Sequence, residues 1–168
     1  MTIEVKKTKL EGVLLIQPDI HTDVRGCNVT LYSKRLYKEH GIDLEFVENK
    51  VSVSKRNVLR GIHGDNDTWK LISCLAGTVF LVVVNCDESS PEFGKSESFT
   101  LSGDNFCQVL VPKKFGNGHL VLSDSAVFHY QWSAYYDLGN QFSYKYNDSR
   151  FNIDWPVQDP IVIGRDKP

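Results

Sequence analysis

The apolar residues of this chain are concentrated in short runs that are typical of β-strands. The runs hold four to seven residues each and are rich in β-branched and aromatic side chains, which suit the pleated, half-buried surface of a sheet. They cover residues 13–16, 51–54, 71–75, 79–84, 106–111, 119–122 and 126–132. We expect each of these runs to form a strand.

Polar and glycine-containing segments lie between these runs and predict turns. They cover residues 76–77, 87–91, 102–105, 116–118 and 123–125. One helix is expected over residues 33–41, with Ser33 able to cap its start and Gly41 to end it. Many short strands separated by turns, with no repeat or linker, predict one all-β domain over residues 1–168, a β-sandwich or a jelly-roll barrel. The mouth of such a barrel can hold a ligand.

Composition and charge agree with one globular domain and narrow its partners. Of the 168 residues, 41% are hydrophobic and 24% are charged, and a chain of this length can bury one core. The formal net charge is -2 and no basic stripe stands out, so we expect neither a nucleic-acid partner nor a membrane surface. A small polar ligand is the expected partner.

The four cysteines give no sign of a metal site. Cys27, Cys74, Cys86 and Cys107 are scattered and lack the close spacing of metal ligands. The chain starts without a charged-then-apolar leader, so we expect a cytoplasmic protein with reduced thiols.

The segment from Val58 to His63 carries the clearest candidate chemistry. It places Arg60 and His63 three residues apart near the end of an apolar run, which suits a base beside an anion clamp. Alternate side chains of a strand point to opposite faces, so the two would diverge unless a bulge or twist at Gly61 re-aimed one of them. Taken alone, a histidine at a strand end is more often structural than catalytic.

A series of motifs in a fixed order along the chain carries a family resemblance. The motifs are Asp23-Val24-Arg25-Gly26, Phe46-Val47-Glu48-Asn49, Val58-Leu59-Arg60-Gly61-Ile62-His63, Lys70-Leu71, Ser90-Pro91-Glu92-Phe93-Gly94, Val111-Pro112-Lys113-Lys114-Phe115-Gly116-Asn117-Gly118, Leu120-Val121-Leu122-Ser123, Tyr135-Tyr136 and Gly164-Arg165-Asp166. In these motifs the chain resembles the dTDP-4-dehydrorhamnose 3,5-epimerase family of metal-independent cupins.

The resemblance implies a fold, an assembly and a reaction. The implied fold is a cupin-type double-stranded β-helix, or jelly roll, with a few short helices. The implied assembly is a homodimer in which an N-terminal strand contributes to the sheet and the site of the neighbouring subunit. The implied reaction is epimerisation at C3, C5 or both, through an enolate, on a nucleotide-diphosphate sugar with a C4 ketone, without metal or cofactor, for bacterial surface polysaccharides.

The resemblance also assigns roles to individual residues. It implies that His63 is the base, that Asp166 pairs with it, that Tyr130 is the acid on the other face of the sugar and that Lys70 is the cation beside the developing enolate. Without it, Lys70 would be interpreted as a solvated turn lysine, Tyr130 as a core aromatic and Asp166 as a hydrated tail residue.

Five further residues are implied to bind substrate. Arg25 and Arg60 match residues that clamp the diphosphate, a role that suits the guanidinium fork. Asn49, Asn117 and Tyr136 are expected to contact the substrate as well. Asn117 stands where the family has a histidine, and an amide cannot act as an acid or base near neutral pH.

Departures from the family pattern bear on the nucleotide. Cys27, Asn28 and Thr30 replace aromatics and a glutamate that hold thymine in the family, and Glu48 and Lys50 also depart from its usual residues. The loop after His63 is similar to the branch that acts on GDP-linked 4-keto-heptoses. We therefore expect a GDP-4-keto-heptose, with a dTDP-4-keto-6-deoxyhexose as the alternative.

Two other functional classes stay open at this point. A metal-dependent cupin needs two or three histidines and a carboxylate around one ion, and His119 could still approach His63 across a barrel. The other class is a sugar-nucleotide isomerase or binder that does not epimerise. The presence of His63, Lys70, Tyr130 and Asp166 together argues against a silent binder, but an isomerase shares the enolate step.

Overall fold

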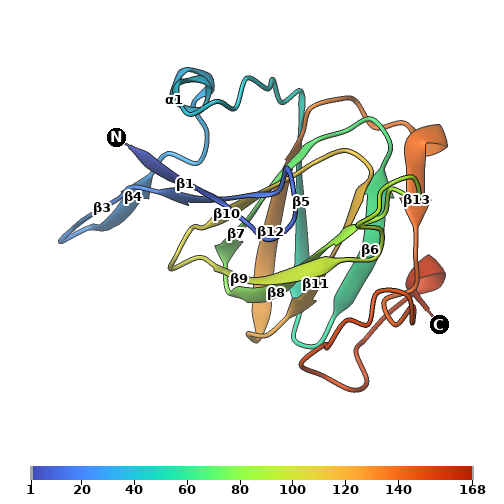
Figure 1. The fold of residues 1–168 in the computed structure, drawn as a ribbon. Helices are drawn as coiled ribbons and strands as arrows, with labels where there is room; N and C mark the ends of the chain where they lie inside the picture. The colour runs from blue at the N-terminus through green and yellow to red at the C-terminus, as the bar shows by residue number, and fades with distance from the viewer. Residues whose placement is uncertain (1, 168) are drawn as a thin grey trace.

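The computed structural model describes residues 2–167 as two antiparallel β-sheets that face each other (Figure 1). The six-stranded sheet has the order β1 (Ile3–Lys7), β2 (Leu14–Pro18), β10 (Gln108–Val111), β7 (Lys70–Ala76), β12 (Ser125–Trp132) and β5 (Glu48–Lys55). The five-stranded sheet has the order β13 (Gln141–Ser143), β6 (Leu59–Asp65), β11 (Phe115–Val121), β8 (Thr78–Asn85) and β9 (Ser96–Ser102). The all-β jelly roll is therefore confirmed.

The main core lies between the sheets and explains why the apolar runs form strands. Val79, Leu81 and Val83 of β8 are fully buried against Ile72 and Cys74 of β7. The alternate residues Val82 and Val84 face the other side of β8, where Ile62, Phe151 and the C-terminal segment cover them. Both faces of β8 are thus buried, which accounts for its continuous apolar run.

The predicted helix exists but is shorter than expected. Helix α1 (Lys34–Glu39) has Ser33 at its N-cap, yet the Ser33 side chain makes no capping hydrogen bond, so the predicted cap is wrong. Gly41 follows the helix with a φ of 83°, a conformation that favours glycine. Packing holds the helix, because buried Tyr37 lies against Ile16 and Leu71, and its hydroxyl donates to the Leu31 carbonyl at 2.7 Å.

The turn predicted at residues 116–118 is wrong, because this segment lies in the middle of β11. Its glycines serve close packing. A Cβ on Gly116 would lie 2.4 Å from the Ile62 side chain, and one on Gly118 would lie 2.8 Å from it. The other four predicted turns lie at or between strand ends.

A bulge in β6 re-aims the candidate residues around Gly61. Asn117 of β11 pairs with His63, whereas His119 pairs with Arg60. Between these two pairs, β6 therefore holds one residue more than β11. Such an extra residue bends a strand and shifts the direction of its side chains. Gly61 has a φ of 129° and its Cα is too close to Gly118 for a Cβ. His63 and Arg60 consequently line the same cavity.

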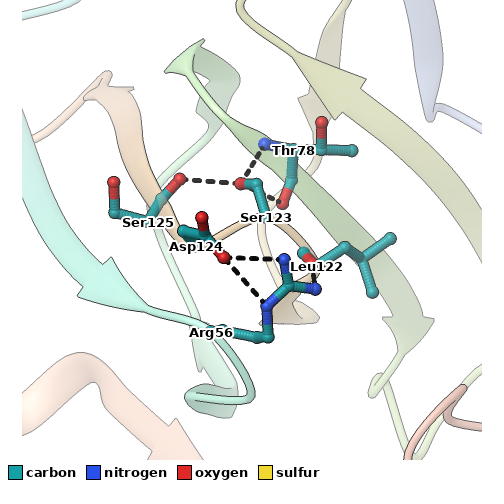
Figure 2. A network of polar contacts seen from close by, with 6 residues as sticks. All are labelled: Arg56, Thr78, Leu122, Ser123, Asp124 and Ser125. Atoms are coloured by element: carbon teal, nitrogen blue, oxygen red, sulfur yellow. Dashed lines mark hydrogen bonds and ion pairs between the residues drawn. The ribbon is translucent and has the colours of Figure 1, made fainter.

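A polar network fixes the turn that joins β11 to β12 (Figure 2). Ser123 Oγ accepts a 2.8 Å hydrogen bond from the Thr78 amide and donates a 2.7 Å bond to the Ser125 carbonyl. Arg56 donates to Asp124 at 2.8 Å and to the Leu122 carbonyl at 2.5 Å. These bonds hold the start of β12 in register, and β12 carries one wall of the cavity.

Two segments lie outside the sheets. The hairpin of β3 (Ile20–Asp23) and β4 (Gly26–Val29) is a separate two-stranded sheet that projects from the barrel (Figure 1). The C-terminal segment after η1 (Leu138–Asn140) and β13 ends in the short helix η2 (Gly164–Asp166). Over residues 2–167, no helix is long and apolar enough to cross a membrane.

Candidate active site

A cavity opens between the two sheets, where β5 and β12 face β6 and β11. Its lining residues are Lys50, Ser52, Arg60, His63, Lys70, Asn117, His119, Phe128, Tyr130, Trp132, Tyr136 and Gln141. Three of these described lining residues are lysine or arginine, and none of them is a carboxylate. A cavity with this balance of charge favours an anionic ligand.

His63 lies on one wall and is paired with a buried carboxylate. Its Nε2 is 2.5 Å from Asp166 Oδ1, and the side chains are 24% and 8% exposed. A carboxylate only accepts hydrogen bonds, so Nε2 carries the proton and Nδ1 holds the lone pair of the neutral ring. The pair therefore orients the imidazole and stabilises its protonated form.

Asp166 reaches His63 because the C-terminal segment runs beside the start of β6. The Ile161 amide donates to the Asn57 carbonyl at 2.7 Å, and the Leu59 amide donates to the Ile161 carbonyl at 3.0 Å. Helix η2 then places Asp166, whose Oδ2 also accepts from the Gly61 amide at 3.3 Å. The interpretation of Asp166 as a hydrated tail residue is wrong.

Lys70 begins β7 and is buried, so it is not a solvated turn lysine. Its side chain is held by two acceptors: Nζ lies 3.3 Å from the His63 carbonyl and 3.2 Å from Asn117 Oδ1. The residue is 4% exposed, and a fixed cation in such a site acts more strongly on nearby charge than it would in water. Asn117 therefore orients Lys70 with its amide oxygen.

Tyr130 lies on the sheet opposite His63, within a row of aromatic rings. Phe128, Tyr130 and Trp132 are alternate residues of β12 and so share one face. Their ring centroids are 5.5 Å and 6.0 Å apart, and Trp132 is 5.7 Å from Tyr136. Tyr130 thus belongs to the cavity wall, where its phenol can serve as an acid.

Lys50 is a cavity residue that the candidate set omitted. It pairs directly with Tyr130 across β5 and β12, and its Nζ lies 3.7 Å from the centroid of the Trp132 ring and 4.3 Å from that of Tyr136. Glu48 lies 3.6 Å from the same ammonium. The available signal for Lys50 was alternation along β5, which places it on the same face as Ser52, another residue of the cavity lining.

His119, which the sequence presented only as a possible metal ligand, lines the cavity. Its ring stacks on Phe128 with centroids 3.7 Å apart and planes at 10°. Burial, with the nearby charges of Arg60 and His63, lowers the pKa of His119 to about 3. His119 is therefore neutral at ordinary pH. It lies two residues beyond Asn117, on the same face of β11, which was the signal for its place in the site.

Arg60 lines the cavity, while two of the expected substrate residues do not. Arg60 donates from Nε to Ser54 Oγ of β5 at 3.1 Å, which fixes its guanidinium against that strand. Asn49 faces the outer side of its sheet and lies 3.2 Å from His129 Nε2. Arg25 lies in the turn of the β3–β4 hairpin, where it pairs with Asp23 at 2.5 Å.

Among residues 2–167, no group of three or more His, Cys, Asp or Glu side chains is arranged to hold a metal ion. The two histidines of the cavity lining are His63, which pairs with Asp166, and His119, whose ring stacks on Phe128. The four cysteines are free thiols. Burial raises the pKa of Cys86 to about 12, which keeps this thiol protonated.

Comparisons with known proteins agree on one family. Residues 7–168 match the model of the dTDP-4-dehydrorhamnose 3,5-epimerases. The chain is 35% identical over 168 residues to the dTDP-4-dehydrorhamnose 3,5-epimerase of Shigella flexneri, with 98% of this chain and 93% of the relative covered.

Solved structures give the same result. The dTDP-6-deoxy-D-glucose-3,5-epimerase of Legionella pneumophila Philadelphia 1, in complex with dTDP-4-keto-L-rhamnose, is 35% identical with a TM-score of 0.91, covering 98% of this chain and 89% of that one. A 3'-monoepimerase from Streptomyces bikiniensis, in complex with dTDP-quinovose, is 29% identical with a TM-score of 0.88, covering 95% and 83%.

Fold and relatives together define a cupin-type isomerase of nucleotide sugars. The chain belongs to the dTDP-4-dehydrorhamnose 3,5-epimerase family, as the sequence motifs predicted.

Proposed function

We propose that this protein inverts carbons beside the C4 ketone of a dTDP-linked 4-keto-6-deoxyhexose. The observation that carries the proposal is the placement of the His63–Asp166 pair and Tyr130 on opposite walls of one cavity, with the Lys70 ammonium held at the His63 carbonyl and at Asn117 Oδ1. Inversion requires a proton to leave one face of the carbon and another to arrive at the opposite face.

His63 would remove the proton through Nδ1, because Nε2 is engaged with Asp166. A C–H bond next to a ketone is a weak acid, so a positioned base is needed. The imidazolium that forms is stabilised by the Asp166 carboxylate at 2.5 Å. The C–H electron pair moves toward the ketone and leaves an enolate.

Lys70 would stabilise the negative charge that develops on the enolate oxygen. Its ammonium is already held by the His63 carbonyl and by Asn117 Oδ1, so little reorganisation is needed during the reaction. Tyr130 would then deliver a proton from the other wall. Because the enolate carbon is planar, protonation from that side gives the inverted centre.

The nucleotide is proposed to be dTDP. The expected GDP-4-keto-heptose gains no support from the relatives, whose names specify dTDP-linked 4-keto-6-deoxyhexoses. The expectation of GDP rested on the loop after His63 and on Cys27, Asn28 and Thr30. Cys27 and Asn28 are exposed on the projecting hairpin, away from the cavity lining. Within one chain, these two residues therefore do not reach a nucleotide base bound in the cavity. We propose that the diphosphate lies near Arg60 and Lys50.

The number of inverted carbons is proposed to be two, C3 and C5. The family and the Shigella and Legionella relatives carry names that specify both positions. The Streptomyces relative, which has the same fold, is named as a 3'-monoepimerase. An enzyme that inverts C3 alone is consequently the second candidate.

Incubation with dTDP-4-keto-6-deoxyglucose in D₂O tests the proposal. We expect deuterium at C3 and C5 and conversion to the L-rhamno product, followed by NMR. Deuterium and inversion at C3 alone would favour the monoepimerase. Absence of exchange, together with tighter calorimetric binding of GDP than of dTDP, would overturn the choice of substrate.

A further inference from the structure

His119 has a polar atom for which the protein provides no partner. The residue is 4% exposed, and its Nε2 makes no hydrogen bond within residues 2–167. The same is true of Ser52 Oγ, and both residues line the cavity. Trp132 Nε1, which also belongs to the cavity lining, is a third such atom. Buried polar atoms are nearly always satisfied, so this group of unsatisfied atoms in the wall of one cavity suggests a polar group on a ligand.

The two side chains flank the same aromatic ring. Ser52 is the cross-strand neighbour of Phe128 on β5 and β12, whereas the His119 ring stacks on Phe128 from β11 at 3.7 Å. The stacking fixes the plane of the imidazole. A histidine held in this way offers Nε2 in one direction, which suits recognition of a single group.

The neutral state of His119 fits binding rather than proton transfer. Burial and the charges of Arg60 and His63 lower its pKa to about 3. A neutral imidazole can donate or accept one hydrogen bond at Nε2, depending on its tautomer. A hydroxyl group can complement either choice.

The position of His119 along the cavity indicates which hydroxyl it meets. In the register of β6 and β11, Asn117 pairs with His63 and His119 pairs with Arg60. His63 is the proposed base near C3 and C5, and Arg60 is proposed to bind the diphosphate at C1. His119 therefore lies toward the C1 end of the sugar. The hydroxyl nearest to that end is the one on C2, the carbon between C1 and C3.

We propose that His119 and Ser52 form a subsite that recognises the C2 hydroxyl of the substrate sugar and so excludes 2-deoxy sugars. The inference rests on the proposed function, because it uses the proposed positions of the base and the diphosphate. A site built to bind a hydroxyl discriminates against the analogue that lacks it, since its buried polar atoms are then left unpaired.

The test compares dTDP-4-keto-6-deoxyglucose with its 2-deoxy analogue. The parent protein is expected to prefer the 2-hydroxy sugar by roughly ten-fold or more in kcat/KM. His119→Phe keeps a ring on Phe128 and should reduce this ratio toward one, mainly through a higher KM for the 2-hydroxy sugar. Ser52→Ala should reduce it in the same direction and involves a smaller change of packing.

His129→Phe is the matched control, because His129 is also a strand histidine but lies partly buried on the outer face of β12, where it contacts Ser73 at 3.0 Å. It should leave the ratio unchanged. Affinity for dTDP alone should be equal in the parent and in His119→Phe, and a loss there would assign the contact to the nucleotide and overturn the inference.

An unchanged ratio in both His119→Phe and Ser52→Ala would also overturn it. Failure of the proposed function gives a different result: the parent protein would exchange deuterium into neither sugar.

Discussion

Asp166 lies 2.5 Å from Nε2 of His63, although 103 positions separate the two residues in the sequence. The bulge at Gly61 turns His63 into the cavity, and the C-terminal segment brings the carboxylate to it. The pairing leaves Nδ1 as the nitrogen that takes the substrate proton in the proposed reaction.

Asp166→Asn should lower kcat by roughly 10² to 10⁴ with a smaller change in KM. The amide has nearly the shape of the carboxylate, but its NH₂ group can donate to Nε2 and so favour a proton on Nδ1, the wrong tautomer for a base. Single-turnover deuterium uptake would measure the effect. Asp148→Asn is the control, because Asp148 pairs with Arg150 at 2.7 Å away from the cavity lining. Equal losses in the two variants would contradict a specific role for Asp166.

His63→Asn should remove proton abstraction while affinity for dTDP stays nearly intact. Loss of a general base costs on the order of 10² to 10⁴ in rate. Deuterium uptake at C3 and C5 reports the chemistry, and calorimetry with dTDP reports binding. His129→Asn serves as the control histidine outside the cavity. Near-normal uptake by His63→Asn would remove His63 from the mechanism.

Tyr130→Phe should separate exchange from inversion. A base on one wall can remove a proton and return it to the same face, so exchange that depends on His63 should stay measurable. Formation of the inverted sugar should fall sharply, because the phenol on the opposite wall is gone. NMR in D₂O follows both processes in one sample. Unchanged inversion would show that Tyr130 only packs against Phe128 and Trp132, and the donor would then be sought at Tyr136 or water.

Local patterns predicted the strands better than they predicted the site. The apolar run at residues 79–84 gave β8, because its β-branched residues are buried on both faces. The glycines at 116 and 118 misled, since glycine signals close packing as well as turns, and only the position of Ile62 distinguishes the two. Ser33 was predicted to cap the helix, but its side chain makes no capping hydrogen bond, and the packing of buried Tyr37 holds the helix instead.

The contacts of the site depend on long-range geometry that no local pattern contains. The pairing of Asp166 with His63 and the support of Lys70 by Asn117 join segments 103 and 47 positions apart. The family motifs identified these residues, whereas spacing alone could not. Lys50 was noted only as a departure from the family pattern and His119 only as a possible metal ligand, although alternation along β5 and β11 places both in the cavity.

Activity should survive exhaustive chelation. In the described part of the chain no cluster of histidine, cysteine and carboxylate side chains is arranged around an ion, and Lys70 provides a fixed positive charge for the enolate. Epimerisation before and after dialysis against EDTA is the measurement, with a zinc-dependent hydrolase treated in parallel to verify that chelation worked. Complete loss of activity, restored by one particular divalent ion, would favour the metal-dependent cupin class.

Arg25 should act in the cavity of a neighbouring subunit if the predicted homodimer forms. Its side chain is 86% exposed on a hairpin that projects from the barrel, and it is absent from the cavity lining of its own chain. A guanidinium that clamps a diphosphate would then come from the partner.

Arg25→Ala and His63→Asn should each be impaired as homodimers. Co-refolding the two variants places both changes in one site of each mixed dimer and leaves the other site complete, so up to about a quarter of the parental activity should return with random pairing. Light scattering during size-exclusion chromatography would establish the dimer. A dimer without any recovery of activity would place Arg25 in its own subunit's site or outside the reaction.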